Sequence, residues 1–253
     1  MRNAGWPLLI FGIFLGVWHT ATAAAWVSPI LLPSPLETVR YLVEATADGL
    51  LIGALLVTLK RLLIGFFIGL IGGLALGFLI YASPLARQTL GLAALGLQTL
   101  PSVCWTPLAI LWFGQSEAAM YFVVIMGTVW ALALAVKNAL EATPPIYIRA
   151  ARVMGASGYH IWTGVILPAA LPQMLSGAKL GWAFAWRSLM AAEIYVVIIN
   201  QFGLGQLLHF GRELNAMDQV LGVMLIIILV GVLADRYVFR PAEKYFQTTR
   251  GLA

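Results

Sequence analysis

The residues of this chain best suited to bind a polar solute lie in one apolar stretch, from about Met174 to Ile199. Lys179, Trp186 and Glu193 follow one another at intervals of seven, so they share one face of a helix, and Arg187 lies about 100° round from Trp186. Charges at the centre of a membrane cost about 2.5–3.5 kcal/mol on insertion scales, so they usually face the interior of a helix bundle. The stretch is therefore a candidate site for recognising a charged ligand.

Two interpretations of these charges stay open. The guanidinium fork of Arg187 could attract an oxyanion in a substrate path, or Arg187 and Glu193 could each pair with a neighbouring helix or a second subunit. We favour the structural pairing for Glu193, while keeping it with Trp182, Trp186 and Arg187 among the candidate path residues. Lys179 lies near one end of the stretch, where its side chain could reach the membrane interface.

Enzyme chemistry and metal binding find little support in the sequence. The three histidines, His19, His160 and His209, lie in different segments, and neither HExxH nor a pair of carboxylates at catalytic spacing occurs. No glycine-rich phosphate loop ending in Gly-Lys-Ser/Thr occurs either. The single cysteine, Cys104, excludes an internal disulfide and a multi-cysteine metal site, and we expect it to be a small buried hydrophobe.

The composition is that of a membrane protein. Of 253 residues, 61% are hydrophobic and 10% are charged, whereas soluble domains carry roughly a quarter charged residues. Several apolar runs exceed the roughly 18 residues of a candidate membrane helix, and a net charge of +5 without a Lys/Arg cluster does not indicate nucleic-acid binding. We expect an all-α, polytopic membrane protein with six transmembrane helices in a single domain. The approximate bounds are Pro7–Trp26, Leu62–Tyr81, Gln88–Phe113, Ala118–Val136, Met174–Ile199 and Gln219–Val238.

The sequence divides into an N-terminal part, a membrane core and a C-terminal tail. We assign residues 1–60 to the first span and an outer connector, residues 61–239 to the core spans and residues 240–253 to a basic cytoplasmic tail. The first span also resembles a cleaved secretion signal, so its retention stays open. In the connector, Ser34-Pro35-Leu36-Glu37 predicts a capping box that opens a short helix.

The second span carries a stripe of glycines. They recur every four residues along one side of the helix, at Gly65, Gly69, Gly73 and Gly77. Glycine lets two backbones approach closely, which drives helix association where lipid offers no hydrophobic force. We expect a tight helix–helix contact along this stripe.

The third span is broken by proline. Pro101 and Pro107 cannot donate backbone hydrogen bonds, so the carbonyls of Leu97 and Val103 need other partners. Broken helices at membrane depth are tolerated where protein or a water-filled cavity surrounds them. Polar residues cluster at this break, and they are candidates for the lining of a translocation path, with a packing kink as the alternative: Gln98, Thr99, Ser102 and Thr106.

Basic residues set the expected orientation. Six spans place both termini and the loop before the fifth span on one side of the membrane. The other side holds four basic residues, Arg40, Lys60, Arg61 and Arg212. The side with the termini holds nine: Arg2, Arg87, Lys137, Arg149, Arg152, Arg236, Arg240, Lys244 and Arg250. The excess predicts that both termini are cytoplasmic.

The loop of residues 141–172 is expected to be ordered. Its prolines permit a helix from Ile146 to Met154, and Gly155 suits the end of that helix. Ser157 can cap a second short helix that runs to about Val165. The small side chains of Ala150 and Ala151 would let the backbone of a partner come close. We expect a stiff lever joined to the fifth span.

This loop resembles the cytoplasmic coupling loop of ABC-importer permeases. The family motif reads Glu-Ala-Ala, three residues, Gly, nine residues, Ile-x-Leu-Pro, and this chain has Ala150-Ala151, Gly155 and Val165-Ile166-Leu167-Pro168. Arg149 stands in the place of the glutamate. The proline-broken third span and the Ala-Ala-Glu193 run are similar to the branch that imports nitrate, sulfonates, taurine and bicarbonate. The resemblance covers most of the chain, from the second span onward.

The resemblance implies the type I importer permease fold in a bacterial inner membrane. It implies a permease subunit that forms the substrate path and works by alternating access, without an ATPase of its own. The implied partners are two ATP-binding subunits that hold ATP and Mg, a second copy of the permease, an external substrate-binding protein and membrane lipid. The residues expected to contact the ATP-binding subunit are Arg149, Ala150, Ala151, Met154, Gly155, Ala156 and Ser157.

The substrate implied by the resemblance is a small oxyanion or an organosulfonate. A heterocyclic vitamin precursor stays open, because nine tryptophans could line an aromatic pocket as well as anchor the membrane interfaces. An autonomous channel or ion-coupled carrier is the alternative from another class, although no internal repeat is found.

Overall fold

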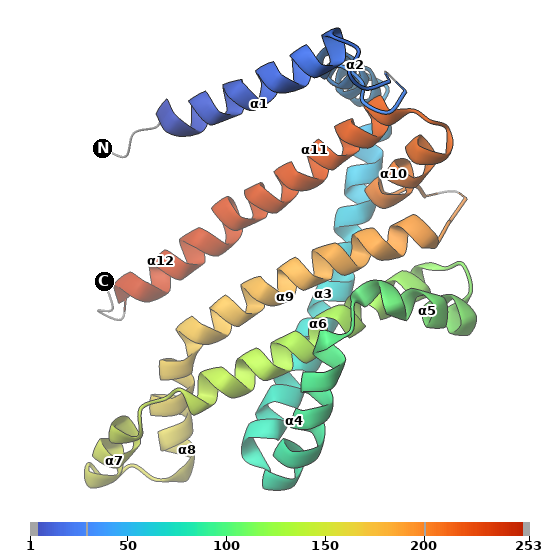
Figure 1. Cartoon of the computed structure of the whole chain (residues 1–253). Helices are drawn as coiled ribbons and strands as arrows, with labels where there is room; N and C mark the ends of the chain where they lie inside the picture. The colour runs from blue at the N-terminus through green and yellow to red at the C-terminus, as the bar shows by residue number, and fades with distance from the viewer. Residues whose placement is uncertain (1–4, 29, 200, 250–253) are drawn as a thin grey trace. The chain divides into compact units, whose positions relative to one another are not determined.

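The computed structural model describes residues 5–28, 30–199 and 201–249, and every regular element in these ranges is a helix. This confirms the all-α prediction. The chain divides into two compact units (Figure 1). One unit comprises residues up to Thr58 together with Ile199–Leu229, and the other comprises Leu59–Ile198 and the residues from Val230 onward.

Four helical segments of the described ranges are long and apolar enough to cross a membrane. They are α3 (Leu50–Ala82), α6 (Glu117–Glu141), the segment Gly158–Tyr195 that ends in α9 (Leu167–Tyr195), and the segment Met217–Phe246 that starts with α11 (Met217–Ala234). A further pair, Pro84–Thr99 and Ser102–Phe113, passes the same test together but is bent by 103°. The first helix, α1 (Gly5–Ala23), holds a shorter apolar stretch, Leu9–Ala23.

The four long segments and the bent pair correspond to five of the six predicted spans, with different bounds, whereas α1 lies at the place of the first predicted span but its apolar stretch is shorter than the others. The second begins at Leu50 rather than Leu62, and the third is two helices that meet at a sharp angle rather than one crossing helix. The orientation count changes with them, because Lys60 and Arg61 lie within α3 rather than in a connector, and Arg61 is completely buried. Arg2 and Arg250, which also entered that count, lie outside the described residues, and the cytoplasmic location of the termini stays a prediction.

The first unit contains α1, the connector helix α2 (Pro35–Ala47), α10 (Leu204–Glu213) and the adjoining parts of α3 and α11. The predicted capping box of α2 is confirmed, because the Ser34 hydroxyl oxygen accepts the backbone N–H of Glu37 at 3.3 Å and the Glu37 side chain bonds back to Ser34. The Glu37 carboxylate accepts hydrogen bonds from the backbone N–H of Ser34 at 2.7 Å and from its hydroxyl at 2.9 Å. These two bonds lower the pKa of Glu37, since they favour its ionised form.

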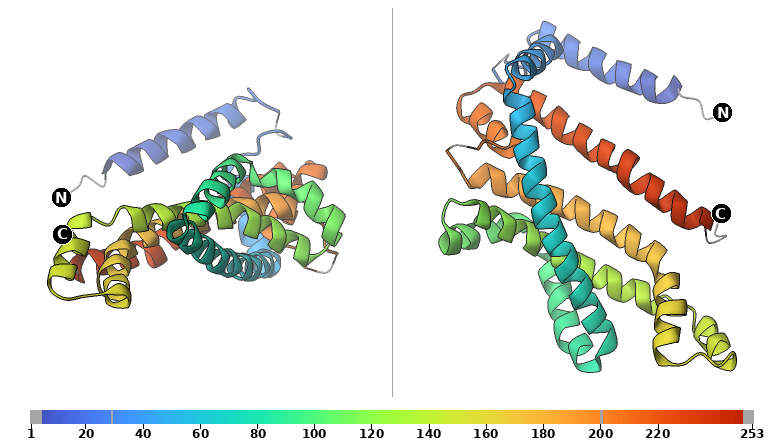
Figure 2. Two further views of the ribbon diagram at one scale, coloured as in Figure 1. Left: turned by 90° about the horizontal axis from the view of Figure 1, so that it is seen from below. Right: turned by 180° about the vertical axis from the view of Figure 1, so that it is seen from behind.

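The second unit is built around α6 and α9, which lie side by side in both views (Figure 1 and Figure 2). Small residues bring them together: a Cβ atom added at Gly177 would lie 2.7 Å from that of Ala135, and one added at Gly181 would lie 2.8 Å from Leu132. Backbones this close gain dispersion contacts that longer side chains would prevent.

The glycine stripe of α3 makes the predicted tight helix–helix contact, and its partner is α6. A Cβ atom at Gly65 would lie 2.7 Å from Val124, and one at Gly73 would lie 2.6 Å from Leu132. At Gly77 it would lie 2.7 Å from the carbonyl oxygen of Ala133. Three helices of the second unit therefore meet through residues without bulky side chains.

The broken span consists of α4 (Pro84–Thr99), the 3₁₀ turn Ser102–Trp105 and α5 (Thr106–Phe113). The carbonyls freed by proline do not need distant partners, because the Leu97 carbonyl accepts the N–H of Leu100 at 3.3 Å and the Val103 carbonyl accepts the N–H of Thr106. Tight turns satisfy both groups locally.

The break also changes the surroundings of Cys104. The side chain is exposed on the 3₁₀ turn, so the prediction that it is buried is wrong. In a continuous helix the apolar neighbours of Cys104 would have covered it, whereas the turn directs it outward.

The loop before the fifth span contains α7 (Pro145–Val153) and α8 (Gly158–Ile161). Gly155 has φ +87°, a left-handed conformation that suits glycine after a helix end. The second helix does not stop near Val165: a π-helical turn, Trp162–Ile166, carries it directly into α9. Ser157 stands at the start of α8 without a capping hydrogen bond from its side chain.

Replacing Gly77 with leucine tests the packing of α3 on α6. We expect the variant to lose about 1–3 kcal/mol of stability, because the added side chain must displace the backbone of α6. Thermal unfolding of the purified protein in detergent measures the effect. Gly96→Leu, at an open position of α4 with no atom within 4 Å of an added Cβ, is the matched control and should change the midpoint little.

Candidate translocation site

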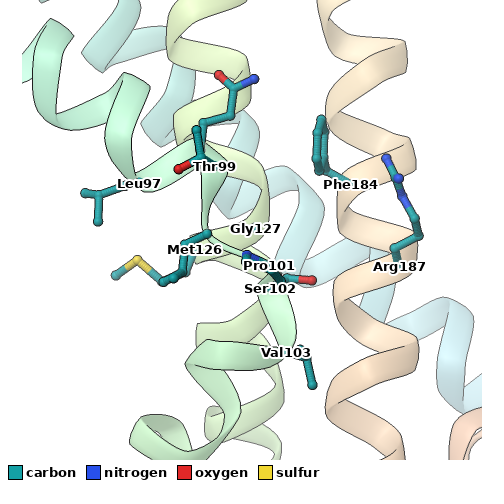
Figure 3. A pocket seen from close by; sticks show the side chains of 11 residues that line it. Leu97, Thr99, Pro101, Ser102, Val103, Met126, Gly127, Phe184 and Arg187 are labelled. Atoms are coloured by element: carbon teal, nitrogen blue, oxygen red, sulfur yellow. The ribbon is translucent and has the colours of Figure 1, made fainter.

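A cavity of about 310 Å³ lies at the break between α4 and the 3₁₀ turn. Figure 3 shows the break on one side and α9 on the other, with the Ser102 hydroxyl directed toward α9. Both apolar and polar groups line it. The lining residues are Leu97, Gln98, Thr99, Leu100, Pro101, Ser102, Val103, Met126, Gly127, Phe184 and Arg187.

Arg187 brings a positive charge to this cavity from α9. Its Nε donates a hydrogen bond to the Ala183 carbonyl at 3.1 Å, and its guanidinium carbon lies 4.7 Å from the centroid of the Phe184 ring. Figure 3 shows the side chain running along the helix beside that ring. The ring face attracts the cation and limits its orientations. No carboxylate of the described residues forms an ion pair with Arg187, so its charge is available to a ligand.

Gly127 sets the distance between the helices at the cavity. A Cβ atom there would collide with the Ser188 hydroxyl of α9 and would lie 3.4 Å from Ser102. The Ser188 hydroxyl donates to the Phe184 carbonyl at 2.7 Å, so its own hydrogen bond is satisfied within α9. The close approach of α6 to α9 and to the broken span is what creates a bounded space here.

The structure brings together four of the predicted path residues, Gln98, Thr99, Ser102 and Arg187. Thr106 does not join them: its side chain is buried at the start of α5, outside the cavity, with its hydroxyl unpartnered. Trp182 and Trp186 line a second cavity on another face of α9.

Glu193 lies in a buried ion-pair cluster rather than in either cavity. Its carboxylate accepts from the Arg61 guanidinium at 3.1 Å, and both side chains are fully buried. The Arg61 Nε lies 3.4 Å from the Glu117 carboxylate, which also accepts from the Tyr121 hydroxyl at 2.8 Å. The cluster joins α3, α6 and α9, which agrees with the structural interpretation of Glu193.

Lys179 is also held by acids. Its ammonium lies 2.6 Å from the Asp235 carboxylate and 3.4 Å from that of Glu243. These residues belong to the π-helical turn Asp235–Phe239 and to α12 (Arg240–Thr249). Lys179 therefore ties α9 to the C-terminal segment of the chain.

The loop of α7 and α8 presents one exposed surface and one buried surface. Val153 is 89% exposed and Met154 80%, whereas Ala151 is only 3% exposed. Ala150 is exposed and stays a predicted contact residue, whereas the burial of Ala151 contradicts the expectation that its side chain faces a partner. Ala151 is covered because it packs in a cluster with residues from the end of α6 and the start of α9. The buried members are Val136, Ala139, Leu140, Ala151, Ile161, Ile166 and Ala170.

Sequence reasoning missed several residues of these sites. Phe184, Met126 and Gly127 have no distinguishing sequence signal, since apolar residues and glycine are common throughout the spans. Arg61 did carry a signal, because an arginine eleven residues inside what is one helix must find a partner. Within the described ranges, no group of His, Cys, Asp and Glu side chains could hold a metal ion.

The described chain thus combines several long apolar helices, a broken span, a cavity with polar groups at the break and an exposed helical loop. The family model for "Binding-protein-dependent transport system inner membrane component" matches residues 65–240. The chain belongs to this family, and it is a permease subunit of an ABC importer.

Relatives and solved structures agree with this assignment. The chain is 33% identical to SsuC of Escherichia coli, a permease protein named for aliphatic sulfonates transport, over 93% of this chain and 88% of that protein. It is 28% identical to the taurine transport system permease protein TauC of Escherichia coli, over 88% and 82%. A chain of the inward-facing MetNI methionine ABC transporter shares the fold, with a TM-score of 0.64, 20% identity and coverage of 79% of this chain and 98% of that chain.

Replacing Arg61 with methionine tests the buried cluster. We expect a loss of about 3–5 kcal/mol, because the Glu193 carboxylate stays buried without the guanidinium that donates to it. The thermal midpoint of the purified subunit measures this loss. Replacing both Arg61 and Glu193 with methionine should recover part of it, and Lys60→Met, at the exposed neighbouring position, should have little effect. Equal midpoints for Arg61→Met and Lys60→Met would contradict the assigned role.

Proposed function

We propose that this permease carries a small organic or inorganic oxyanion, of the sulfonate type, past Arg187 at the break of the third span. The observation that carries the proposal is the placement of one arginine, without an acidic partner among the described residues, on a cavity lined by Gln98, Thr99 and Ser102. The names of the two relatives, one for aliphatic sulfonates and one for taurine, support the same class of substrate.

The chemistry of the cavity suits an oxyanion. A guanidinium presents parallel N–H groups that match two oxygens of a sulfonate or carboxylate. The hydroxyls of Thr99 and Ser102 and the amide of Gln98 supply further donors without adding negative charge. A single fixed cation among neutral donors favours passage over tight retention, as a transport path requires.

We further propose that ATP is hydrolysed by two partner subunits, which hold ATP and Mg, and that α7 and α8 dock on them. Two copies of this permease would form the path, with both termini in the cytoplasm and an external binding protein delivering the substrate. The cluster around Ala151 supports transmission of force, because it joins the loop to the end of α6 and the start of α9. Movement of the loop would therefore move α9, which carries Arg187.

Replacing Arg187 with glutamine tests the path. We expect uptake of a sulfonate to fall about tenfold to a hundredfold, since hydrogen bonds to a charged group contribute about 1.5–3 kcal/mol. Uptake is measured in liposomes that contain the complete transporter, with its assembly checked by size-exclusion chromatography. Arg212→Gln, a change to an exposed arginine of α10, is the control. Normal uptake and normal substrate affinity in Arg187→Gln would refute the path role.

Disulfide cross-linking tests the docking of the loop. In a Cys104→Ser background, which removes the exposed native thiol, Met154→Cys should cross-link to a cysteine in the groove of the ATP-binding subunit. Ala151→Cys is the matched control, because Ala151 is buried within the loop and should not react. Cross-links from position 151 without cross-links from position 154 would contradict the proposal that the exposed surface of the loop contacts the ATP-binding subunit.

A further inference from the structure

A second cavity, of about 300 Å³, adjoins Arg187 on another face of α9. It lies between α9 and the segment Gly231–Phe239, within the second unit. Unlike the first cavity, the second has three aromatic rings in its lining. The lining residues are Lys179, Trp182, Ala183, Trp186, Arg187, Gly231, Asp235 and Phe239.

Arg187 belongs to both cavities because of its position on the helix. It follows Phe184 of the first cavity by three residues and Ala183 of the second by four, and both spacings bring side chains onto neighbouring surfaces of a helix. One guanidinium therefore stands at the boundary between a space lined by hydroxyl and amide groups and a space lined by indole rings.

The aromatic walls of the second cavity are held by packing. The Trp182 ring contacts Phe239 edge-on at 6.0 Å between centroids, and it contacts Phe66 of α3 at 5.2 Å on the same basis. Trp186 is 8% exposed. Rings fixed in this way form a pocket that loses little conformational entropy when a ligand enters.

The charges of Lys179 and Asp235, which also line the second cavity, are balanced by neighbouring ions. The Lys179 ammonium is paired with the Asp235 and Glu243 carboxylates, and Asp235 also accepts from the Arg240 Nε at 2.9 Å. The positive charge that the cavity offers to a ligand is therefore that of Arg187. A ligand that uses both cavities would place its anionic group at Arg187 and its apolar part among the rings.

We infer that the second cavity binds the organic body of the substrate, and that this body is a planar aromatic or heteroaromatic ring. The inference rests on the proposed function, since it takes Arg187 as the anion site. It makes Trp182 and Trp186 specificity-determining residues. An inorganic oxyanion or a one-carbon sulfonate would occupy only the Arg187 end and leave the aromatic surface unused.

Binding to the complete permease–ATPase complex in lipid nanodiscs tests the inference. Dissociation constants of methanesulfonate and benzenesulfonate are measured by ligand-observed NMR without the external binding protein, which has its own specificity. We expect benzenesulfonate to bind at least about fivefold more tightly, since stacking of one ring on an aromatic side chain contributes about 1–3 kcal/mol. Equal affinities for the two sulfonates would overturn the inference.

Substitutions in the cavity distinguish the two proposals. Trp186→Ala should weaken the binding of benzenesulfonate, so that the affinities for the two sulfonates come within about threefold of each other. The affinity for methanesulfonate should stay the same, because this ligand does not reach the rings. Trp182→Leu replaces this variant if Trp186→Ala fails to assemble. Trp112→Ala, at an exposed tryptophan of α5 outside both cavities, should preserve the preference. If the tryptophan variants keep the preference, the inference is wrong and the anion site stands. If Arg187→Gln binds both sulfonates normally, the anion site itself is wrong.

Discussion

Close approach between helix backbones is the constraint on which the second unit depends. α6 contacts α3 through Gly65, Gly73 and Gly77, and it contacts α9 through Gly177 and Gly181. Apolar side chains gain no hydrophobic free energy by leaving lipid for protein, so association must come from dispersion contacts and from polar groups. The stripes of small residues allow the dispersion contacts, and the ion-pair cluster of Arg61, Glu117 and Glu193 provides the polar interactions.

The same small residues define where a solute can bind. Gly127 permits α6 to lie against Ser188 of α9, and this contact closes one side of the cavity at the broken span. The break satisfies its own freed carbonyls within short turns, so it does not require water or another helix for stability. Its polar side chains are therefore left to face the cavity, where an anion can use them.

The charges of α9 show how one helix can serve three purposes. Glu193 joins the helix to α3, Lys179 joins it to the C-terminal segment, and Arg187, between them, has no acidic partner among the described residues. Because neighbours neutralise both flanking charges, Lys179 does not compete with Arg187 for an anion, and Glu193 does not compete with an anion for Arg187. The π-helical turn Asp235–Phe239 supplies the Asp235 carboxylate that pairs with Lys179, and such turns often lie near functional sites.

The sequence alone determined the features that follow from local pattern. Composition predicted the helical membrane fold, the spacing of glycines predicted that one side of α3 packs tightly on another helix, and Ser34 with Glu37 predicted the start of α2. Periodicity also placed Arg187 and the polar residues of the break as candidates. Each of these depends on residues close together in the chain, whose geometry a regular helix dictates.

Only the tertiary structure decided which side chains meet. It separated Trp182 and Trp186 from the break, buried Thr106 and Ala151, exposed Cys104, and paired Glu193 with an arginine 132 positions away. Sequence spacing gives the face of a helix on which a residue lies, but it does not give the partner that the face meets. The partner depends on how α3, α6 and α9 pack against one another. For this reason only the folded structure shows that Arg187 lines two cavities.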